Sequence, residues 1–166
     1  MALNRKLFTA GFILCLLLLA GGYYVQYQLL VEPCSLCLLQ RFIYYVIGGI
    51  FLLGAIHNPK NWGAYIYAAS NCCAAIIGGL LASRQLWLQH LPPEQLPSCT
   101  PGLERLLQIH PLFDSLRIIL QGAGECGKVK FHLFGVSLPL WSLLGFTALG
   151  ILSGLILYLR TKKRRT

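Results

Sequence analysis

Four long apolar runs constrain the fold of this chain more than any other feature of its sequence. They cover approximately residues 7–30, 38–56, 62–83 and 138–159. A helix needs about 20 apolar residues to cross the hydrocarbon core of a bilayer. Because 56% of the 166 residues are hydrophobic and only 11% are charged, lipid must be the solvent for most of the surface. The sequence therefore predicts an all-α integral membrane protein, a four-helix transmembrane bundle forming one domain over residues 1–166.

The first run has features of both a signal peptide and a membrane span. Arg5 and Lys6 precede it, and Ala20 with the two glycines after it resembles a cleavage site. However, the run continues to Val31, which is longer than the roughly 7–15 residues of a signal-peptide core. We therefore expect it to be retained as the first span.

Basic and acidic residues divide between the segments that flank the spans. The N-terminal end, the link at residues 57–61 and the C-terminal tail carry only basic charges, whereas the acidic residues occupy the other two segments: Glu32, Glu94, Glu104, Asp114 and Glu125. By the positive-inside rule, both termini are cytoplasmic and the acidic segments face outward. The net charge of +9 is concentrated beside the apolar runs at the termini, so nucleic acid is not an expected partner.

The second outer segment, residues 84–137, is long and rich in proline and glycine, which predicts turns. Apolar residues recur at helical spacing over residues 112–120. They predict a short amphipathic helix, either on the bilayer surface or packed on a small core of the loop itself. Within the spans, small residues four apart predict close helix packing: Gly78 with Ala82, and Gly150 with Gly154.

The seven cysteines fall into two groups by their position relative to the spans. Four lie in or beside outer segments: Cys34, Cys37, Cys99 and Cys126. Disulfides persist in an oxidising compartment such as a bacterial periplasm. The other three, Cys15, Cys72 and Cys73, lie inside spans, where a cysteine usually fills space as a small apolar residue.

The first outer pair is a CxxC motif at the mouth of the second span. Pro33 suits the first position of a helix, which would place Cys34 and Cys37 in the first two turns. Unpaired N–H groups and the positive end of the helix dipole favour thiolates there. Arg41 lies one turn beyond Cys37 on the same face. Its position predicts a functional role, although an interfacial arginine can also extend to lipid phosphates.

The second outer pair, Cys99 and Cys126, encloses a turn-rich loop. In isolation the two could form a structural disulfide. Two outer pairs in a small membrane protein favour thiol–disulfide relay instead, because lipid already holds the helices together. A zinc site built from all four cysteines has only one pair with the usual ligand spacing, and no suitably spaced histidines accompany it. We therefore predict no metal site.

Together these residues resemble the DsbB family of disulfide bond formation proteins over nearly the whole chain. The most specific segment runs from Glu32 to Arg41 and resembles the family's Pro-Cys-x-x-Cys-x-x-x-Arg signature. Further support comes from Pro97-Ser98-Cys99, Gly124-Glu125-Cys126, and the entry to the last span from Gly135 to Trp141.

The resemblance implies a quinone-dependent protein-disulfide oxidoreductase in the bacterial inner membrane. It also implies that the active cysteines lie on the periplasmic face and form two redox-active disulfides, Cys34–Cys37 and Cys99–Cys126. A reduced DsbA-type thioredoxin-fold oxidase would form a mixed disulfide with Cys99, after which Cys126 would join Cys34. Cys37 would then be freed as a thiolate that passes two electrons to a quinone of the membrane pool, ubiquinone or menaquinone. Arg41 would stabilise the thiolate and the charge on the quinone oxygen. A DsbA-like oxidant has a reduction potential near about −120 mV, so only a strongly oxidising acceptor such as a quinone can reoxidise it.

The sequence departs from the family pattern at one position. Gln85 stands where many members carry a histidine near the quinone. An amide can donate a hydrogen bond there but cannot titrate, and His90 is the other candidate for the quinone contact.

Two alternative functions remain. One is a VKOR-like quinone reductase, in which the CxxC usually lies near a late span. The other is a non-catalytic membrane scaffold or metal-binding bundle with structural disulfides.

Overall fold

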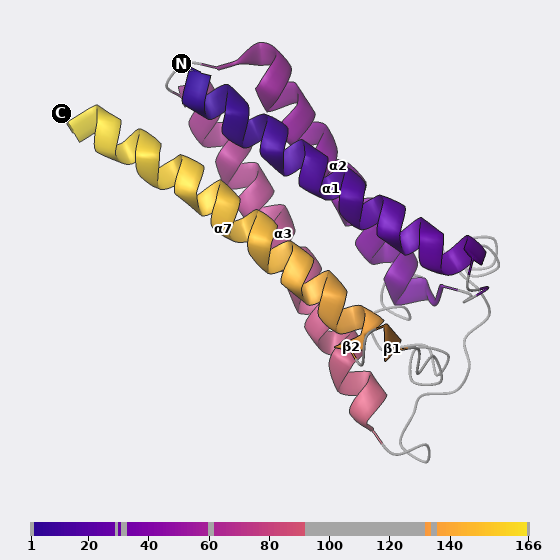
Figure 1. Ribbon diagram of the computed structural model, residues 1–166. Coiled ribbons are helices and arrows are strands. Elements are labelled where there is room, and N and C mark those ends of the chain that lie inside the picture. The colour runs from indigo at the N-terminus through magenta and orange to yellow at the C-terminus, as the bar shows by residue number, and fades with distance from the viewer. Residues whose placement is uncertain are drawn as a thin grey trace, which may run out of the picture.

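The fold is a bundle of four long helices in a computed structural model that describes residues 2–28, 30, 33–59, 62–91, 132–133 and 136–165 (Figure 1). The helices are α1 (Ala2–Gln28), α2 (Ser35–His57), α3 (Trp62–His90) and α7 (Leu138–Arg165). Each is long and apolar enough to cross a membrane. The predicted all-α membrane bundle is confirmed.

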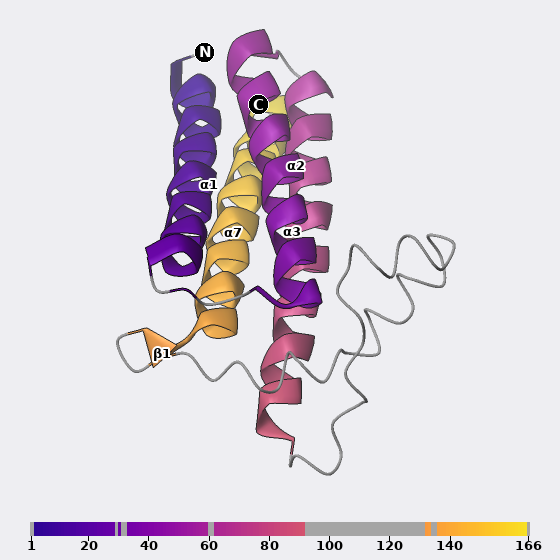
Figure 2. The same cartoon turned by 90° about the vertical axis from the view of Figure 1, so that its right-hand side faces the viewer.

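The helices pack in a ring, and both ends of the chain lie at one end of it. α1 packs along α2, α2 along α3 and α3 along α7, while α7 and α1 contact each other more sparsely. Figure 2 shows the first residues of α1 and the last residues of α7 at the end of the bundle opposite the start of α2. The CxxC motif therefore lies at the far end from both termini.

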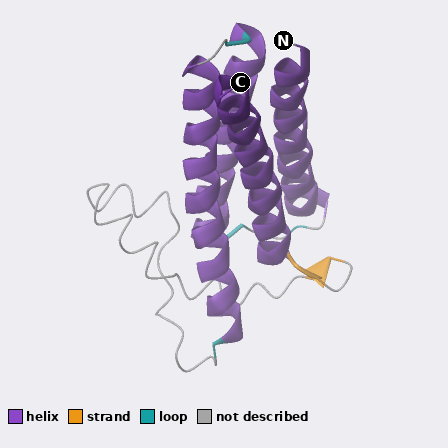
Figure 3. Cartoon of the chain, turned by 90° about the vertical axis from the view of Figure 1, so that its left-hand side faces the viewer, coloured by secondary structure: helices purple, strands orange, loops and turns teal. Residues whose placement is uncertain are grey.

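Two short strands, β1 (His132–Leu133) and β2 (Val136–Ser137), precede α7. They pair antiparallel, with His132 opposite Ser137. Figure 3 shows this pair at the end of the bundle away from the termini. Because β2 leads directly into α7, the pair positions the first turn of α7 beside the CxxC end.

Reciprocal phenylalanine–glycine contacts hold α1 against α2. A Cβ atom on Gly11 would lie 2.6 Å from the ring of Phe51, and one on Gly54 would lie 2.6 Å from the ring of Phe8. The two rings meet edge to face with centroids 6.1 Å apart. Since lipid gives no hydrophobic drive for helices to associate, this close packing is what stabilises the pair.

Close helix packing is confirmed at both small residues of the first predicted pair, but at only one residue of the second pair. A side chain on Gly78 would collide with the ring of Phe146, and Ala82 is fully buried. A Cβ on Gly150 would lie 3.7 Å from the Cβ of Ala75, but one on Gly154 would meet no described atom within 4 Å. The packing interpretation is therefore wrong for Gly154.

The third helix is longer than predicted, since α3 continues past residue 83 to His90. The hydropathy falls at Ser83, Arg84 and Gln85, but each of these side chains has a partner in the helix or the bundle. Arg84 lies over the ring of Trp87, at 4.6 Å from its centroid, and Ser83 bonds the carbonyl of Gly79. The amphipathic helix predicted over residues 112–120 and most of the long outer loop lie outside the described residues.

Candidate active site

The CxxC motif lies at the N-terminus of α2, two positions earlier in the helix than predicted. Pro33 precedes the helix, Cys34 is its N-cap with an extended ψ of 166°, and the helix begins at Ser35. The carbonyl of Cys34 accepts the first backbone bond, from Leu38 at 3.1 Å. The prediction that Pro33 begins the helix is wrong, and Cys37 consequently lies in the first turn rather than the second. The first N–H groups of a helix have no partner within it, and Cys37 lies in the turn that carries them.

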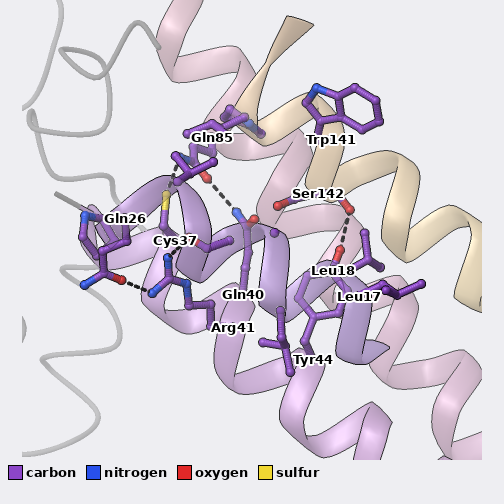
Figure 4. A pocket seen from close by; sticks show the side chains of 17 residues that line it. Leu17, Leu18, Gln26, Cys37, Gln40, Arg41, Tyr44, Gln85, Trp141 and Ser142 are labelled. Carbon is purple, nitrogen blue, oxygen red and sulfur yellow. Dashed lines mark hydrogen bonds between the residues drawn. The ribbon is translucent and has the colours of Figure 1, made fainter. Parts of the chain in front are cut away.

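The two sulfurs lie side by side and share one hydrogen-bond donor. The Sγ atoms of Cys34 and Cys37 are 3.1 Å apart. The amide nitrogen of Gln85 donates to Cys37 Sγ at 3.0 Å and to Cys34 Sγ at 3.4 Å. Cys34 is buried, whereas Cys37 is half-buried. Figure 4 shows Gln85 reaching the Cys37 sulfur from α3. The structure thus brings Gln85 to the cysteines themselves.

A second glutamine holds the other end of this amide. The Nε2 atom of Gln40, on α2, donates to Oε1 of Gln85 at 2.7 Å (Figure 4). Both side chains are almost fully buried, with 3% of Gln40 and 2% of Gln85 exposed. Apolar residues surround this end of the bundle, among them Leu36, Leu81 and Leu88. This hydrogen bond therefore gives the buried Gln85 oxygen its donor and the buried Gln40 NH₂ group an acceptor.

Arg41 is held by the first helix, and does not depend on lipid phosphates for its partners. Its guanidinium donates to Oε1 of Gln26 and, at 2.9 Å, to the carbonyl oxygen of Gly22. It also lies over the ring of Tyr23, with Cζ 4.7 Å from the centroid. Three contacts from one neighbouring helix fix the position of this charge close to Cys37 (Figure 4).

A cavity of about 230 Å³ opens beside the cysteines and is lined by residues of all four helices. Cys37, Gln40, Arg41 and Gln85 give it a polar end. Its walls are otherwise mainly apolar, with leucines of α1 facing the first turns of α7: Leu17, Leu18, Leu19, Val25, Leu138, Pro139 and Trp141. A site of this composition suits a ligand with a polar head and an apolar body.

Tyr44 forms part of the cavity wall and joins α2 to α7. Its hydroxyl donates to the carbonyl oxygen of Ser142 at 2.9 Å, and its ring stacks on Phe146 with centroids 4.1 Å apart. A Cβ on Gly145 would lie 2.5 Å from the same hydroxyl. These contacts fix the first turns of α7 against the site.

Four of the sequence-predicted residues come together here: Cys34, Cys37, Arg41 and Gln85. Cys99 and Cys126 lie outside the described residues. His90, the other candidate for a quinone contact, is exposed at the end of α3, with its Nδ1 atom 2.8 Å from the carbonyl oxygen of Leu86. It does not line the cavity.

Sequence reasoning did not assign Gln40 or Gln26 to the site. The signal was present, because both are polar side chains inside apolar runs, and polar residues at membrane depth are usually functional. Of the cysteines inside spans, Cys15 is buried and packs near Gly48, as predicted. Cys73 is exposed on α3, so the space-filling interpretation is wrong for that residue.

Comparison with known proteins identifies the family. The model of the family described as "Disulfide bond formation protein DsbB" matches residues 4–156. A disulfide bond formation protein B of Nitrosococcus oceani is 42% identical over 149 residues, covering 90% of this chain and 88% of the relative. Those of Hahella chejuensis and Azoarcus sp. are 44% and 40% identical, covering 82% and 93% of this chain and 87% and 93% of the relatives. The chain therefore belongs to the DsbB family of disulfide bond formation proteins.

Proposed function

We propose that this protein is a quinone-dependent oxidoreductase that reoxidises a DsbA-type thiol oxidase in the periplasm. Membership of the family already makes it a multi-pass membrane protein of disulfide bond formation and a thiol oxidoreductase. The observation that carries the finer proposal is the position of Cys37, whose side chain lines the polar end of an otherwise mainly apolar cavity. A thiol so placed can exchange electrons with a lipid-soluble acceptor.

Electrons enter through the outer loop and reach Cys37 by thiol–disulfide exchange. A thiolate of the reduced partner attacks Cys99 in a Cys99–Cys126 disulfide and forms a mixed disulfide with it. The released Cys126 thiolate then attacks Cys34 Sγ, so that a Cys126–Cys34 bond forms and the Cys34–Cys37 bond breaks. The electron pair of the broken bond stays on Cys37 Sγ. Each exchange conserves one disulfide and moves two electrons inward.

The cavity fits a quinone head group. Its volume of about 230 Å³, its leucine-rich walls and its single polar end match a flat apolar ring with oxygens at its edge. When bound, a quinone supplies a two-electron acceptor with a more positive potential than a thiol pair. Leu18, Pro139 and Trp141 would contact the ring, and Arg41 would bind an oxygen.

Arg41 contributes a positive charge that is already in place before the reaction. Because Gln26, Gly22 and the ring of Tyr23 hold the guanidinium, little reorganisation is needed when negative charge develops on Cys37. Such preorganised charge in a water-poor site lowers the barrier more than a mobile side chain could. Burial beside the leucines strengthens the effect by lowering the local dielectric constant.

The proposed location is the bacterial inner membrane, with the cysteines on the periplasmic face. The support is the charge distribution, since Arg5, Lys6, Arg160 and Lys162 lie near the two ends of the chain. Figure 1 shows both chain ends at the same end of the bundle. That end is expected to be cytoplasmic. The CxxC motif at the opposite end then meets the compartment in which disulfides are made.

The test is quinone-dependent oxidation of a reduced DsbA-type partner by the purified protein in lipid nanodiscs. Cys37→Ser should abolish the reaction, because no thiolate then faces the cavity. Cys73→Ser is the matched control and should oxidise the partner at the wild-type rate. Retention of quinone-dependent oxidation by Cys37→Ser would falsify the proposed relay. A scaffold with inert disulfides would be revealed by thiol trapping, since its cysteines would stay oxidised after quinone is removed.

A further inference from the structure

The two buried glutamines beside the cysteines form a directed chain of hydrogen bonds. Gln40 Nε2 donates to Gln85 Oε1 at 2.7 Å, and Gln85 Nε2 donates to the sulfurs of Cys37 and Cys34 at 3.0 and 3.4 Å (Figure 4). The chain crosses from α2 to α3 and returns to α2. Neither amide is assigned a role by the relay described above.

The direction of this chain matters because a carboxamide has unlike ends. Its NH₂ group stabilises negative charge on a sulfur, whereas its oxygen accepts hydrogen bonds and would repel a thiolate. The terminal torsion of a glutamine has a broad, roughly two-fold profile. Nothing in the covalent structure of Gln85 therefore determines which end faces Cys37.

Gln40 supplies that determinant. If Gln85 reversed alone, its NH₂ group would face the NH₂ group of Gln40, and its oxygen would face two sulfurs. With 3% and 2% of the two side chains exposed, water is not at hand to satisfy the mismatched groups. If both amides reversed together, the hydrogen bond between them would survive. The thiolate would still favour the observed direction, because hydrogen bonds to a charged acceptor are about twice as strong as neutral ones.

We propose that Gln40 is a positioning residue that holds the NH₂ group of Gln85 toward the Cys37 sulfur, so that Gln85 stabilises the thiolate as it leaves Cys34. This inference rests on the proposed function and concerns one step of it. In that step Cys126 Sγ bonds to Cys34 Sγ, the Cys34–Cys37 bond breaks, and its electron pair remains on Cys37. The N–H donor of Gln85 is already in place when that charge forms.

The test measures Cys37 directly, without partner or quinone. The full-length protein in nanodiscs is reduced with dithiothreitol, freed of reductant and treated with iodoacetamide at pH 7, and alkylation of the Cys37 peptide is followed by mass spectrometry. Gln85→Met should slow alkylation about tenfold, the effect of losing one hydrogen bond to a charged group. Gln40→Met should slow it about threefold, because the amide then samples both directions.

The double variant separates positioning from a structural role. If Gln40 acts only through Gln85, adding Gln40→Met to Gln85→Met should slow alkylation no further. The matched control is Asn71→Leu, which removes another buried amide from α3, one that no described group bonds. It should alkylate Cys37 at the wild-type rate. Should Gln40→Met unfold the bundle, Gln40→Glu keeps nearly the same size, lacks the NH₂ group and should slow alkylation at least as much.

Two results would overturn the inference. One is an unchanged alkylation rate in Gln40→Met, and the other is an equal slowing by Gln40→Met in the presence and absence of Gln85. Because the alkylation assay contains no partner and no quinone, it can contradict the role of Gln40 even where Cys37→Ser still abolishes turnover. Failure of this inference is thereby distinguishable from failure of the proposed function.

Discussion

The amide nitrogen of Gln85 lies 3.0 Å from the sulfur of Cys37, although 48 residues separate them in the chain. The contact joins the last third of α3 to the first turn of α2. Cys37 thus has a hydrogen-bond donor from a neighbouring helix. Its environment is arranged to accept negative charge.

Replacing Gln85 with glutamate should slow turnover more than replacing it with methionine. Gln85→Glu keeps an acceptor for Gln40 but places an oxygen against Cys37, so we expect partner oxidation to fall more than tenfold at pH 7, because an acceptor then opposes the thiolate. Gln85→Met removes only the donor. Turnover at saturating quinone measures both. Equal or faster turnover in Gln85→Glu would show that the amide does not act as a donor.

Replacing Arg41 with lysine should weaken quinone use, although the charge is kept. The guanidinium bonds Gln26 and Gly22 at once, and a lysine ammonium has no planar fork to do so. We expect the KM for quinone to rise about tenfold, the effect of losing one charge-assisted hydrogen bond. Gln26→Leu, which removes one of the two hydrogen-bond acceptors of the guanidinium, should raise the KM for quinone less. Steady-state kinetics with varied quinone provide the measurement, and an unchanged KM in Arg41→Lys would contradict the role of the fork.

Filling the mouth of the cavity should displace the quinone. Leu17 and Leu16 are adjacent on α1 and are 65% and 49% exposed, but only Leu17 lines the cavity. Leu17→Trp should therefore lower the quinone retained per purified molecule by more than half, because the larger ring occupies the volume. Leu16→Trp is the matched control and should retain wild-type amounts. Equal retention by both variants would place the quinone elsewhere.

A methyl group at Gly54 should destabilise the bundle, whereas one at Gly49 should not. A Cβ at Gly54 would lie 2.6 Å from the Phe8 ring, but one at Gly49 meets no described atom within 4 Å. Gly54→Ala should lower the free energy of unfolding by about 1–3 kcal/mol through overpacking. Gly49→Ala should be neutral or should raise it by up to about 1 kcal/mol through helix propensity. Thermal unfolding in detergent compares the two, and equal stability of both variants would exclude the Phe8 contact as the cause.

Removing the buried amide of Asn71 should stabilise the protein. Both polar atoms of this side chain are buried, and neither has a hydrogen-bond partner among the described residues. An unsatisfied buried polar group costs about 1–3 kcal/mol, so Asn71→Leu should raise the free energy of unfolding by about 1 kcal/mol. The same unfolding assay provides the measurement. A loss of stability would indicate that a buried water molecule satisfies the amide.

Much of the fold was predictable because membrane spans are a local property of the chain. Length and hydropathy alone located all four helices. Helix ends were harder to predict, since they depend on partners. The third helix was predicted to end at Ser83, yet it continues to His90 because Arg84 stacks on Trp87 and Gln85 bonds Gln40 and the cysteines.

By itself, the sequence determined a four-span membrane bundle, a thiol pair at the mouth of the second span and an arginine one turn away. These follow from composition and from spacing within a single helix, where neighbours are fixed by the helical repeat. Only the tertiary structure decided that Gln26 of α1 holds Arg41, and that Gln85 of α3 donates to Cys37 while Gln40 orients it. The physical reason is that packing between helices sets these contacts. Phenylalanine rings lying on glycines fix how the helices meet, and no local pattern encodes the resulting register.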